Sequence, residues 1–493
     1  MKRKSWIVVV CVCLFTLASA RPYAVKRLGL EQGLSNSYVV SITQDKHGFI
    51  WFATESGLNR FDGTSFVVYK RQNRRANSLN GNALNKVYAD KADDVVWVAS
   101  QRDGLNAFDC KTETFRSYVN QPGNPGSIAS NAITDIINSS DGNLWLASYH
   151  MGVDYFDKTK KQFIHYNRST LPGLVSDNVW SVAEDSKGNL YIGHVFDGLS
   201  VYSTKDKTIK NYSYSNTPGS IPGNDVRCLF IDNYENVWVG TTNGLALFDQ
   251  GSGRFISFKN NPANPNSLIS NFIYTITQPK DGQLWIGTET GGISILDIRK
   301  GMFLSPEKVS FQNINSSDGK NGLSHPTVRS IFQDSFRNTW IATYGGGVNF
   351  ISSEPDFFQL WQYSPLPDAA NSLSKSVAWG LCTDNEGQVW VGTDGGGIDV
   401  FKAGQKTASY KKGAAPRGLS DNAVLSGFKD SKGILWFGTY SGGITRYLPG
   451  EKKFEHFSPA GFTAKDIRCF YEDKNGFIWI GTNGDGLYRY LPE

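Results

Sequence analysis

The chain has 493 residues, a formal net charge of +5, 40% hydrophobic residues and 19% charged residues. This length exceeds that of one ordinary hydrophobic core and predicts two domains, and the modest share of charged residues argues against a disordered chain. No basic stripe occurs along the sequence, so we expect no nucleic-acid partner.

The first twenty residues predict a cleavable secretory signal. Lys2-Arg3-Lys4 is positively charged, Trp6 to Leu17 is apolar, and Ala18-Ser19-Ala20 supplies the small residues of a cleavage site. An uncleaved membrane anchor is the alternative, but an apolar run of about a dozen residues is short for a hydrocarbon core of ~30 Å. We therefore expect residues 1–20 to be removed and the mature protein, which begins at Arg21, to be periplasmic.

One sequence unit recurs along the rest of the chain. Residues 45–54 read DKHGFIWFAT, and closely similar segments return at residues 281–288 and 473–482. Ten units follow one another at intervals of 43 to 55 residues. Their marker aromatic residues are Trp51, Trp97, Trp145, Tyr191, Trp238, Trp285, Trp340, Trp390, Trp436 and Trp479. A period of this length without a 3.6-residue pattern is typical of propeller blades rather than helical repeats.

Each unit is predicted to form four short strands. An apolar strand such as residues 39–42 leads into an Asp-x-x-Gly turn, and the strand with the marker aromatic follows. A Gly-rich turn, a third strand such as residues 57–61, and a fourth strand with an aromatic pair such as Phe66 and Tyr69 complete the unit. Aspartate accepts hydrogen bonds within its own turn, and the marker aromatics fill the space between blades. The predicted fold class is therefore all-β, a seven-bladed β-propeller followed by an incomplete second propeller of three blades.

The boundary between the two propellers is predicted near residue 353. Residues 21–353 form the first propeller, because the segment from Tyr23 to Leu28 lies where a fourth strand belongs and can close the ring on its last blade. Residues 354–493 form the partial second propeller. The segment from Phe357 to Trp361 is expected to be another fourth strand, which starts the second ring. In an alternative register Phe357 to Leu360 completes the seventh blade, and a single ten-bladed ring is a further alternative. Three blades cannot close a ring, so we expect the second propeller to be truncated or covered by another chain.

The repeated core Asp-x-x-Gly-x-[Ile/Leu]-Trp-[Ile/Val/Phe]-[Gly/Ala]-Thr, followed by Gly-Gly-[Ile/Val/Leu], resembles the two-component regulator propeller repeat over residues 22–493. That repeat builds the periplasmic sensor region of hybrid two-component system sensor kinases of Bacteroidetes. The resemblance implies a module that senses glycan-derived oligosaccharides and regulates polysaccharide utilisation. It also implies a sensor-kinase remainder or partner chain that covers the open second propeller. The sequence contains no kinase nucleotide site or phospho-acceptor segment, so we expect no kinase activity of these residues.

No catalytic or metal-binding pattern stands out in the sequence. The six histidines are scattered over different units without metal-ligand spacing, and neither a Gly-x-Ser-x-Gly elbow nor a phosphate loop occurs. Cys110, Cys228, Cys382 and Cys469 are widely spaced and are expected to be free thiols. We therefore expect no enzyme, no metal and no cofactor. A propeller-fold polysaccharide lyase or hydrolase and a protein-interaction platform are the alternative functions.

Differences between equivalent positions of the units predict where a ligand binds. The position eleven residues before the marker aromatic varies and is often large, and the second turn of each unit is expected on the same face. The predicted ligand-binding residues are Trp180, Arg227, Tyr274 and Arg329 from the first position and Tyr149, His194, Glu289 and Tyr344 from the second turn. Arginine beside aromatic residues suits an anionic or neutral sugar, through bidentate hydrogen bonds and ring stacking. We predict an oligosaccharide or another small ligand at this mouth of the channel. The alternative is that these side chains only fill the channel mouth and contact water. Whether the chain forms a homodimer is left open.

Overall fold

The computed structural model describes residues 25–75, 77–280, 282–299, 309–317, 322–353, 360–365 and 371–491. Apart from one short 3-10 helix, η1 (Leu30–Gln32), the regular structure of these residues is β-strand, which confirms the all-β fold class. None of the described residues forms a helix with the length and apolarity needed to cross a membrane. The predicted signal at residues 1–20 and most of the 357–360 segment lie outside the described residues. The chain divides into two compact units, Met1–Pro355 and Asp356–Glu493.

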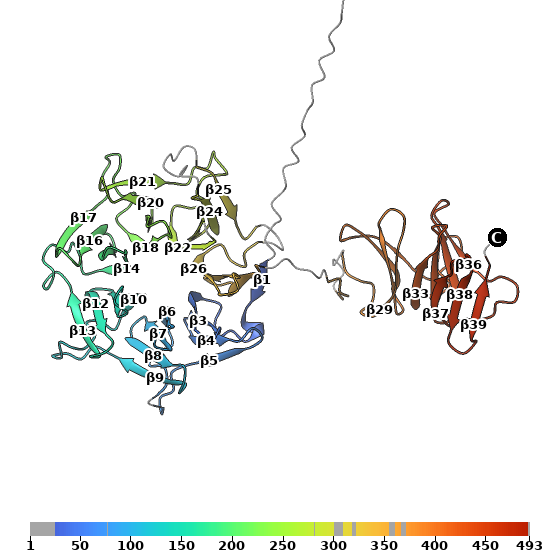
Figure 1. The fold of residues 1–493 in the computed structure, drawn as a ribbon, viewed down its shortest axis with the longest axis horizontal. Coiled ribbons are helices and arrows are strands. Elements are labelled where there is room, and N and C mark those ends of the chain that lie inside the picture. The colour runs from blue at the N-terminus through green and yellow to red at the C-terminus, as the bar shows by residue number, and fades with distance from the viewer. Residues whose placement is uncertain are drawn as a thin grey trace, which may run out of the picture. The chain divides into compact units, whose positions relative to one another are not determined.

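The described strands of the first unit form seven four-stranded antiparallel sheets (Figure 1). The first three sheets are β2 (Val39–Gln44), β3 (Ile50–Thr54), β4 (Gly57–Phe61) and β5 (Phe66–Tyr69); β6 (Leu84–Asp90), β7 (Val95–Ser100), β8 (Leu105–Asp109) and β9 (Thr114–Tyr118); and β10 (Ile133–Asn138), β11 (Leu144–Ser148), β12 (Gly152–Asp157) and β13 (Gln162–Tyr166). The next three are β14 (Val179–Glu184), β15 (Asn189–His194), β16 (Leu199–Ser203) and β17 (Thr208–Tyr212); β18 (Val226–Ile231), β19 (Val237–Thr241), β20 (Gly244–Asp249) and β21 (Arg254–Phe258); and β22 (Ile273–Lys280), β23 (Gln283–Thr288), β24 (Ile293–Asp297) and β25 (Phe311–Ile314). The seventh sheet contains β26 (Val328–Gln333), β27 (Thr339–Thr343), β28 (Val348–Ile351) and β1 (Val25–Leu28).

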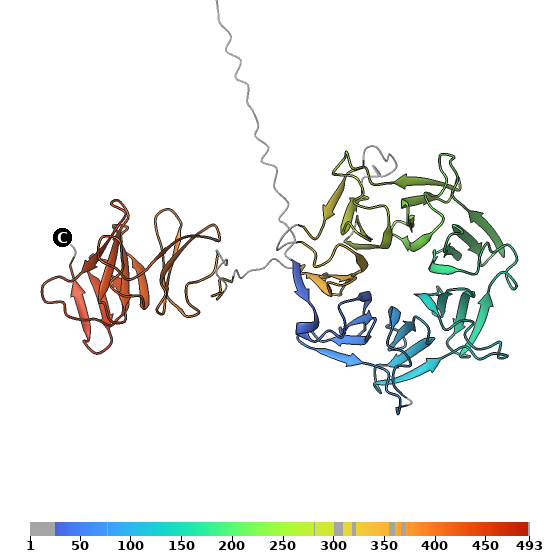
Figure 2. The same cartoon turned by 180° about the vertical axis from the view of Figure 1, so that it is seen from behind.

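The seven sheets close into a ring. Their innermost strands, β2, β6, β10, β14, β18, β22 and β26, contact one another in a continuous cycle in which β26 also lies against β2. Figure 2 shows the same ring of sheets from behind. Strand β1 pairs antiparallel with β28, from Val25 opposite Ile351 to Leu28 opposite Val348. The segment that precedes the first repeat therefore supplies the outer strand of the last sheet, as predicted from its position in the sequence.

The hydrophobic core lies between neighbouring sheets. Trp51 of β3 is fully buried and packs with Leu79, Leu84 and Phe108, which belong to the second sheet and the segment that leads into it. The ring centroids of Trp51 and Phe108 are 5.0 Å apart. Similar clusters form between the other pairs of neighbours, and each buried aromatic side chain removes ~150–250 Å² from water. The marker aromatics thus hold adjacent sheets together, as the repeat pattern predicts.

The repeated aspartate connects its turn to the buried marker aromatic. Asp232 accepts hydrogen bonds from the backbone N–H groups of Tyr234 (2.9 Å) and Asn236 (3.0 Å) through Oδ1, and from the Trp238 indole N–H through Oδ2 (2.8 Å). The same three bonds recur at Asp45, Asp334, Asp384 and Asp473. Hydrogen bonds to an ionised acceptor are stronger than those to a neutral one. These aspartates are therefore structural residues of the blade.

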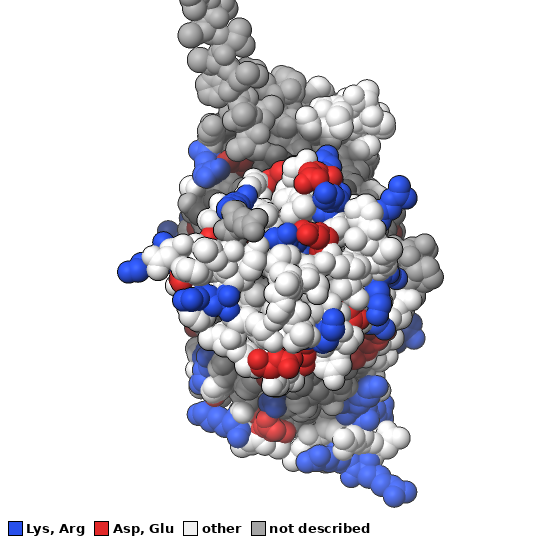
Figure 3. Space-filling model, turned by 90° about the vertical axis from the view of Figure 1, so that its right-hand side faces the viewer, with Lys and Arg blue, Asp and Glu red and all other residues white. Residues whose placement is uncertain are grey.

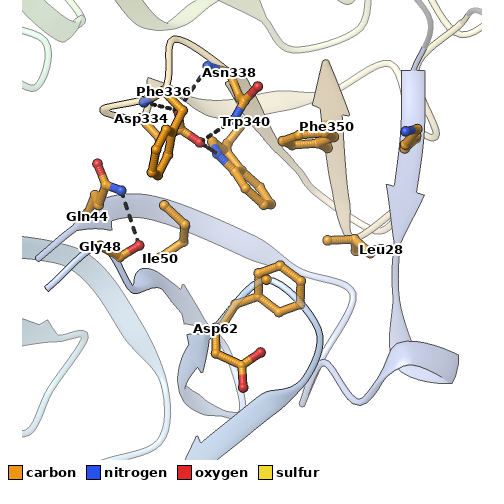
Figure 4. A pocket seen from close by; sticks show the side chains of 13 residues that line it. Leu28, Gln44, Gly48, Ile50, Asp62, Asp334, Phe336, Asn338, Trp340 and Phe350 are labelled. Carbon is orange, nitrogen blue, oxygen red and sulfur yellow. Dashed lines mark hydrogen bonds between the residues drawn. The ribbon is translucent and has the colours of Figure 1, made fainter. Parts of the chain in front are cut away.

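A groove of about 360 Å³ follows the junction of the first and last sheets. Figure 4 shows Leu28, Ile50, Trp340 and Phe350 among the side chains that line it. At its rim, Asp334 accepts the Trp340 indole N–H at 2.8 Å. The apolar side chains pack against one another across the closure of the ring. The groove is thus largely a packing feature of ring closure.

The described strands of the second unit form three sheets that contact one another in a row through β29, β33 and β37. They are β29 (Ala378–Thr383), β30 (Val389–Thr393), β31 (Gly397–Lys402) and β32 (Gln405–Tyr410); β33 (Val424–Lys429), β34 (Leu435–Thr439), β35 (Ile444–Leu448) and β36 (Lys453–Phe457); and β37 (Ile467–Glu472), β38 (Ile478–Thr482) and β39 (Leu487–Tyr490). The two end sheets expose large apolar side chains, among them Trp379 and Leu381 of β29 and Tyr471 of β37. On the face drawn in Figure 3, basic and acidic side chains are interspersed among uncharged ones.

Candidate functional site

A β-bulge in the inner strand positions the side chains of the candidate site. In β14 the pairing with β15 shifts at Trp180, which has no partner across the ladder. The same shift falls on Arg227 in β18, Tyr274 in β22 and Arg329 in β26. A bulge bends the strand and re-aims the unpaired side chain. The variable column found in the sequence is therefore the bulge position, where the hydrogen-bond ladder places little demand on the side chain.

The bulge residues surround the channel at the end where each inner strand begins. A cavity of about 140 Å³ is lined by the bulge residues of all seven sheets, which are Val40, Asn85, Thr134, Trp180, Arg227, Tyr274 and Arg329. A larger cavity of about 920 Å³ shares six of these residues, all except Val40, and extends over the second turns. We call this larger space the mouth cavity. Its volume is near the upper end of the range of ~300–1,000 Å³ that is usual for ligand pockets.

Seven of the eight predicted ligand-binding residues line the mouth cavity. The inner strands contribute Trp180, Arg227, Tyr274 and Arg329, and the second turns contribute Tyr149, Glu289 and Tyr344. They come from five of the seven sheets, because the second turn of each sheet lies beside the beginning of its inner strand. The ring thus gathers side chains that are up to 195 residues apart in the sequence.

Arginine and aromatic side chains alternate along one side of the mouth cavity. The guanidinium carbon of Arg227 lies 4.7 Å from the ring centroid of Trp180, and that of Arg329 lies 4.1 Å from the centroid of Tyr274. Arg329 also lies 5.9 Å from the centroid of Tyr344. Such cation–π contacts hold a guanidinium by its face and leave its N–H edge available for hydrogen bonds. This arrangement can bind an anionic or hydroxyl-rich ligand by its edges.

The two arginines differ in their electrostatic surroundings. Arg227 forms an ion pair with Asp225 at 2.6 Å, and both side chains are largely buried. Arg329 has no ion pair with any described residue, and the Tyr274 ring beside it has a pKa that burial raises and Arg329 lowers in part. The Tyr274 hydroxyl lies 3.5 Å from Glu289 Oε1. Arg227 is therefore compensated by Asp225, whereas no described carboxylate forms an ion pair with Arg329.

His194 does not reach the mouth cavity, and its predicted place there is wrong. Its side chain is fully buried at the end of β15, with Nε2 2.8 Å from Ser200 Oγ. Burial lowers the pKa of His194 to about 4, so the imidazole is neutral at physiological pH. The other sheets have Thr or Ser at this position, such as Thr54 and Thr241, and these are buried as well. A comparison with the equivalent hydroxyl residues would have assigned His194 to the interior of its blade.

Sequence reasoning missed Phe196 as a residue of the site. Phe196 lines the mouth cavity with 69% of its surface exposed, and its backbone has a φ of +70°. Its counterpart in the preceding sheet, His150, has a φ of +78° and is held by a 2.7 Å hydrogen bond to Asn178 Oδ1 and by the ring of Tyr149. The sequence did contain one signal for Phe196: it is a large residue at the turn position that Gly345 occupies in the seventh sheet.

Among the described residues, no group of three or more His, Cys, Asp or Glu side chains could hold a metal ion, and no catalytic domain is evident in the part of the chain that the structure describes. The cysteines Cys110, Cys228, Cys382 and Cys469 are free, as predicted. Burial raises the pKa of the Cys228 thiol, which keeps it protonated and unreactive.

Comparisons with known proteins agree with this architecture. The family described as "Two component regulator propeller" matches residues 33–56, 127–150, 173–195, 220–243, 267–290, 372–395 and 461–484. The extracellular domain of the hybrid two component system BT3049 from B. thetaiotaomicron is 44% identical with a TM-score of 0.62, over 96% of this chain and 60% of that one. "Histidine kinase P4" of Formosa agariphila is 44% identical over 48 residues, 10% of this chain and 4% of the kinase. This chain therefore spans only part of the length of each relative. Seven of its segments are matched as two-component regulator propeller repeats.

Proposed function

We propose that the chain is the ligand-sensing propeller module of a two-component signalling system, that it acts outside the cytoplasm, and that it binds glycan-derived oligosaccharides. The family match and the similarity to an extracellular domain of a hybrid two component system support the first two parts. The expected secretory signal at residues 1–20 supports periplasmic export. In this proposal the occupied propeller passes its signal to a sensor-kinase remainder or a partner chain.

The observation that supports oligosaccharide binding is the alternation of arginine and aromatic side chains along the mouth cavity. Sugars combine apolar C–H faces with many hydroxyl groups, so they bind where aromatic faces lie beside hydrogen-bonding side chains. Trp180 and Tyr344 offer aromatic surface, and Arg329 and Glu289 offer a donor and an acceptor. These residues occupy bulge and turn positions, where their identity is less constrained by the fold.

Isothermal titration calorimetry of the full chain tests the proposal. The ligands are di- to hexasaccharides released from neutral and acidic plant and animal polysaccharides. We expect at least one series to bind and the Trp180→Ala variant to lose tenfold or more in affinity. Trp379→Ala is the matched control, because Trp379 occupies the equivalent column position in the second unit and is 58% exposed. Binding that is unchanged in Trp180→Ala, or that is lost in Trp379→Ala, would contradict the proposed site.

A further inference from the structure

Phe196 has a backbone conformation that glycine adopts more readily than phenylalanine. Its φ of +70° lies in the left-handed region, and the equivalent residues Gly345 and Gly395 have φ values of +116° and +83°. A side chain in this region is strained, and a phenylalanine there is more unusual than an asparagine or glycine. Strain of this kind persists where the side chain has a use that the fold itself does not provide.

Packing does not explain the side chain of Phe196. It is 69% exposed and makes no ring contact with the described residues. The strained His150 in the neighbouring sheet, in contrast, is held by Asn178 and Tyr149. Because Phe196 borders the mouth cavity, its aromatic face is available to a molecule in that cavity. An exposed aromatic ring beside polar groups is suited to the C–H face of a sugar ring.

The charges of the mouth cavity restrict the kind of sugar. Arg329 and Arg102 line it without an ion pair to any described residue, and Glu55 and Glu289 line it as well. A densely sulfated chain would bring many anionic groups close to the two glutamates, which is unfavourable because like charges repel. One carboxylate at Arg329 can form a bidentate, charge-assisted pair, and the glutamates can then accept hydrogen bonds from sugar hydroxyls.

We propose that the mouth cavity takes an oligosaccharide of uronic acid type, with one carboxylate at Arg329 and a sugar ring stacked on Phe196. This inference rests on the proposed function and names the class of its ligand. The cavity volume of about 920 Å³ exceeds what a single sugar needs, so the ligand is an oligosaccharide of a few residues. Phe196 is a binding residue that is retained at the expense of backbone strain.

The first test measures the contribution of the ligand's carboxylate. Di- to tetrasaccharides of galacturonate, mannuronate, guluronate or glucuronate are titrated into the full chain by calorimetry, each beside its methyl ester. We expect one uronate series to bind at least tenfold more tightly than its ester, and Arg329→Gln to abolish that difference. Equal affinity for acid and ester, or binding of neutral oligosaccharides only, would overturn the inference and leave the proposed function standing. Binding of no oligosaccharide at all would overturn both.

The second test separates binding from folding at Phe196. Phe196→Gly is expected to raise the melting temperature by about 1–4 °C, because glycine relieves the strained φ, and to weaken binding of the uronate ligand at least tenfold. Lys207→Gly is the matched control: Lys207 has a φ of +57° in an exposed turn of the same sheet and does not line the mouth cavity. It should gain similar stability and keep its affinity. A Phe196→Gly variant that is less stable, or that binds normally, would show that Phe196 is structural.

Discussion

Replacing Asp232 by alanine tests how the repeated aspartate stabilises a blade. The substitution removes the acceptor of the Trp238 indole N–H, and Trp238 is fully buried. A buried donor without an acceptor costs ~1–3 kcal/mol. The loss of the two backbone bonds from Tyr234 and Asn236, whose donors can regain water, adds about 1 kcal/mol. The expected total is therefore about 2–4 kcal/mol.

Differential scanning calorimetry of the full chain measures this loss. A ring of roughly 330 residues that melts as one unit has an unfolding entropy of about 0.7 kcal/mol/K, so its melting temperature should fall by about 3–6 °C. Asp249→Ala is the control, since Asp249 lies in an exposed turn of the same sheet and accepts bonds from Gly251 and Ser252 but from no indole. We expect its melting temperature to change by less than about 1.5 °C. Equal shifts for the two variants would refute the structural role of the Asp–Trp bond.

Three further changes test other parts of the structure. His165 Nδ1 lies 2.6 Å from a carboxylate oxygen of Asp154, and this hydrogen bond raises the pKa of His165. The protonated pair should therefore stabilise the fold below roughly pH 6.5. As the pH rises through the raised pKa of His165, the melting temperature of the wild type should fall toward that of His165→Gln. Gly240→Ala should cost about 1–3 kcal/mol in a urea titration, because its Cβ would lie 2.4 Å from Cys228 Sγ. Deleting β1 (Val25–Leu28) should leave the outer edge of β28 without a partner strand and lower the melting temperature of the first unit. An unchanged value would mean that β1 does not close the ring.

Most of the fold could be predicted because the sequence features that determine it act locally and recur in every unit. The Asp turn, the marker aromatic and the turn glycine each act within a few residues, and their ten copies average out the exceptions. The position of β1 was predicted for the same reason, since the segment from Tyr23 to Leu28 has the sequence of a fourth strand without a preceding first strand. The indole hydrogen bond of the aspartate was missed, because it depends on the approach of two side chains six residues apart across a turn.

The candidate site could be predicted only in part. The varied column was recognised, but its cause, a β-bulge at Trp180 and its equivalents, depends on strand register, which the sequence does not show. His194 was misplaced because a shift of one position along a strand reverses the direction of the side chain, so that it faces the interior of the blade and not the channel. Phe196 was missed because backbone strain becomes visible only when φ is known.

Hydrogen–deuterium exchange of the full chain with and without a bound oligosaccharide tests the central claim most directly. The account predicts protection of peptides that contain the second turns and bulges around the mouth cavity, such as residues 149–152, 178–182, 194–198 and 343–347. Peptides from the closure groove between the first and last sheets, such as residues 60–66, should exchange as before. Protection confined to that groove, or to the second unit, with unchanged exchange around the mouth cavity would contradict the account.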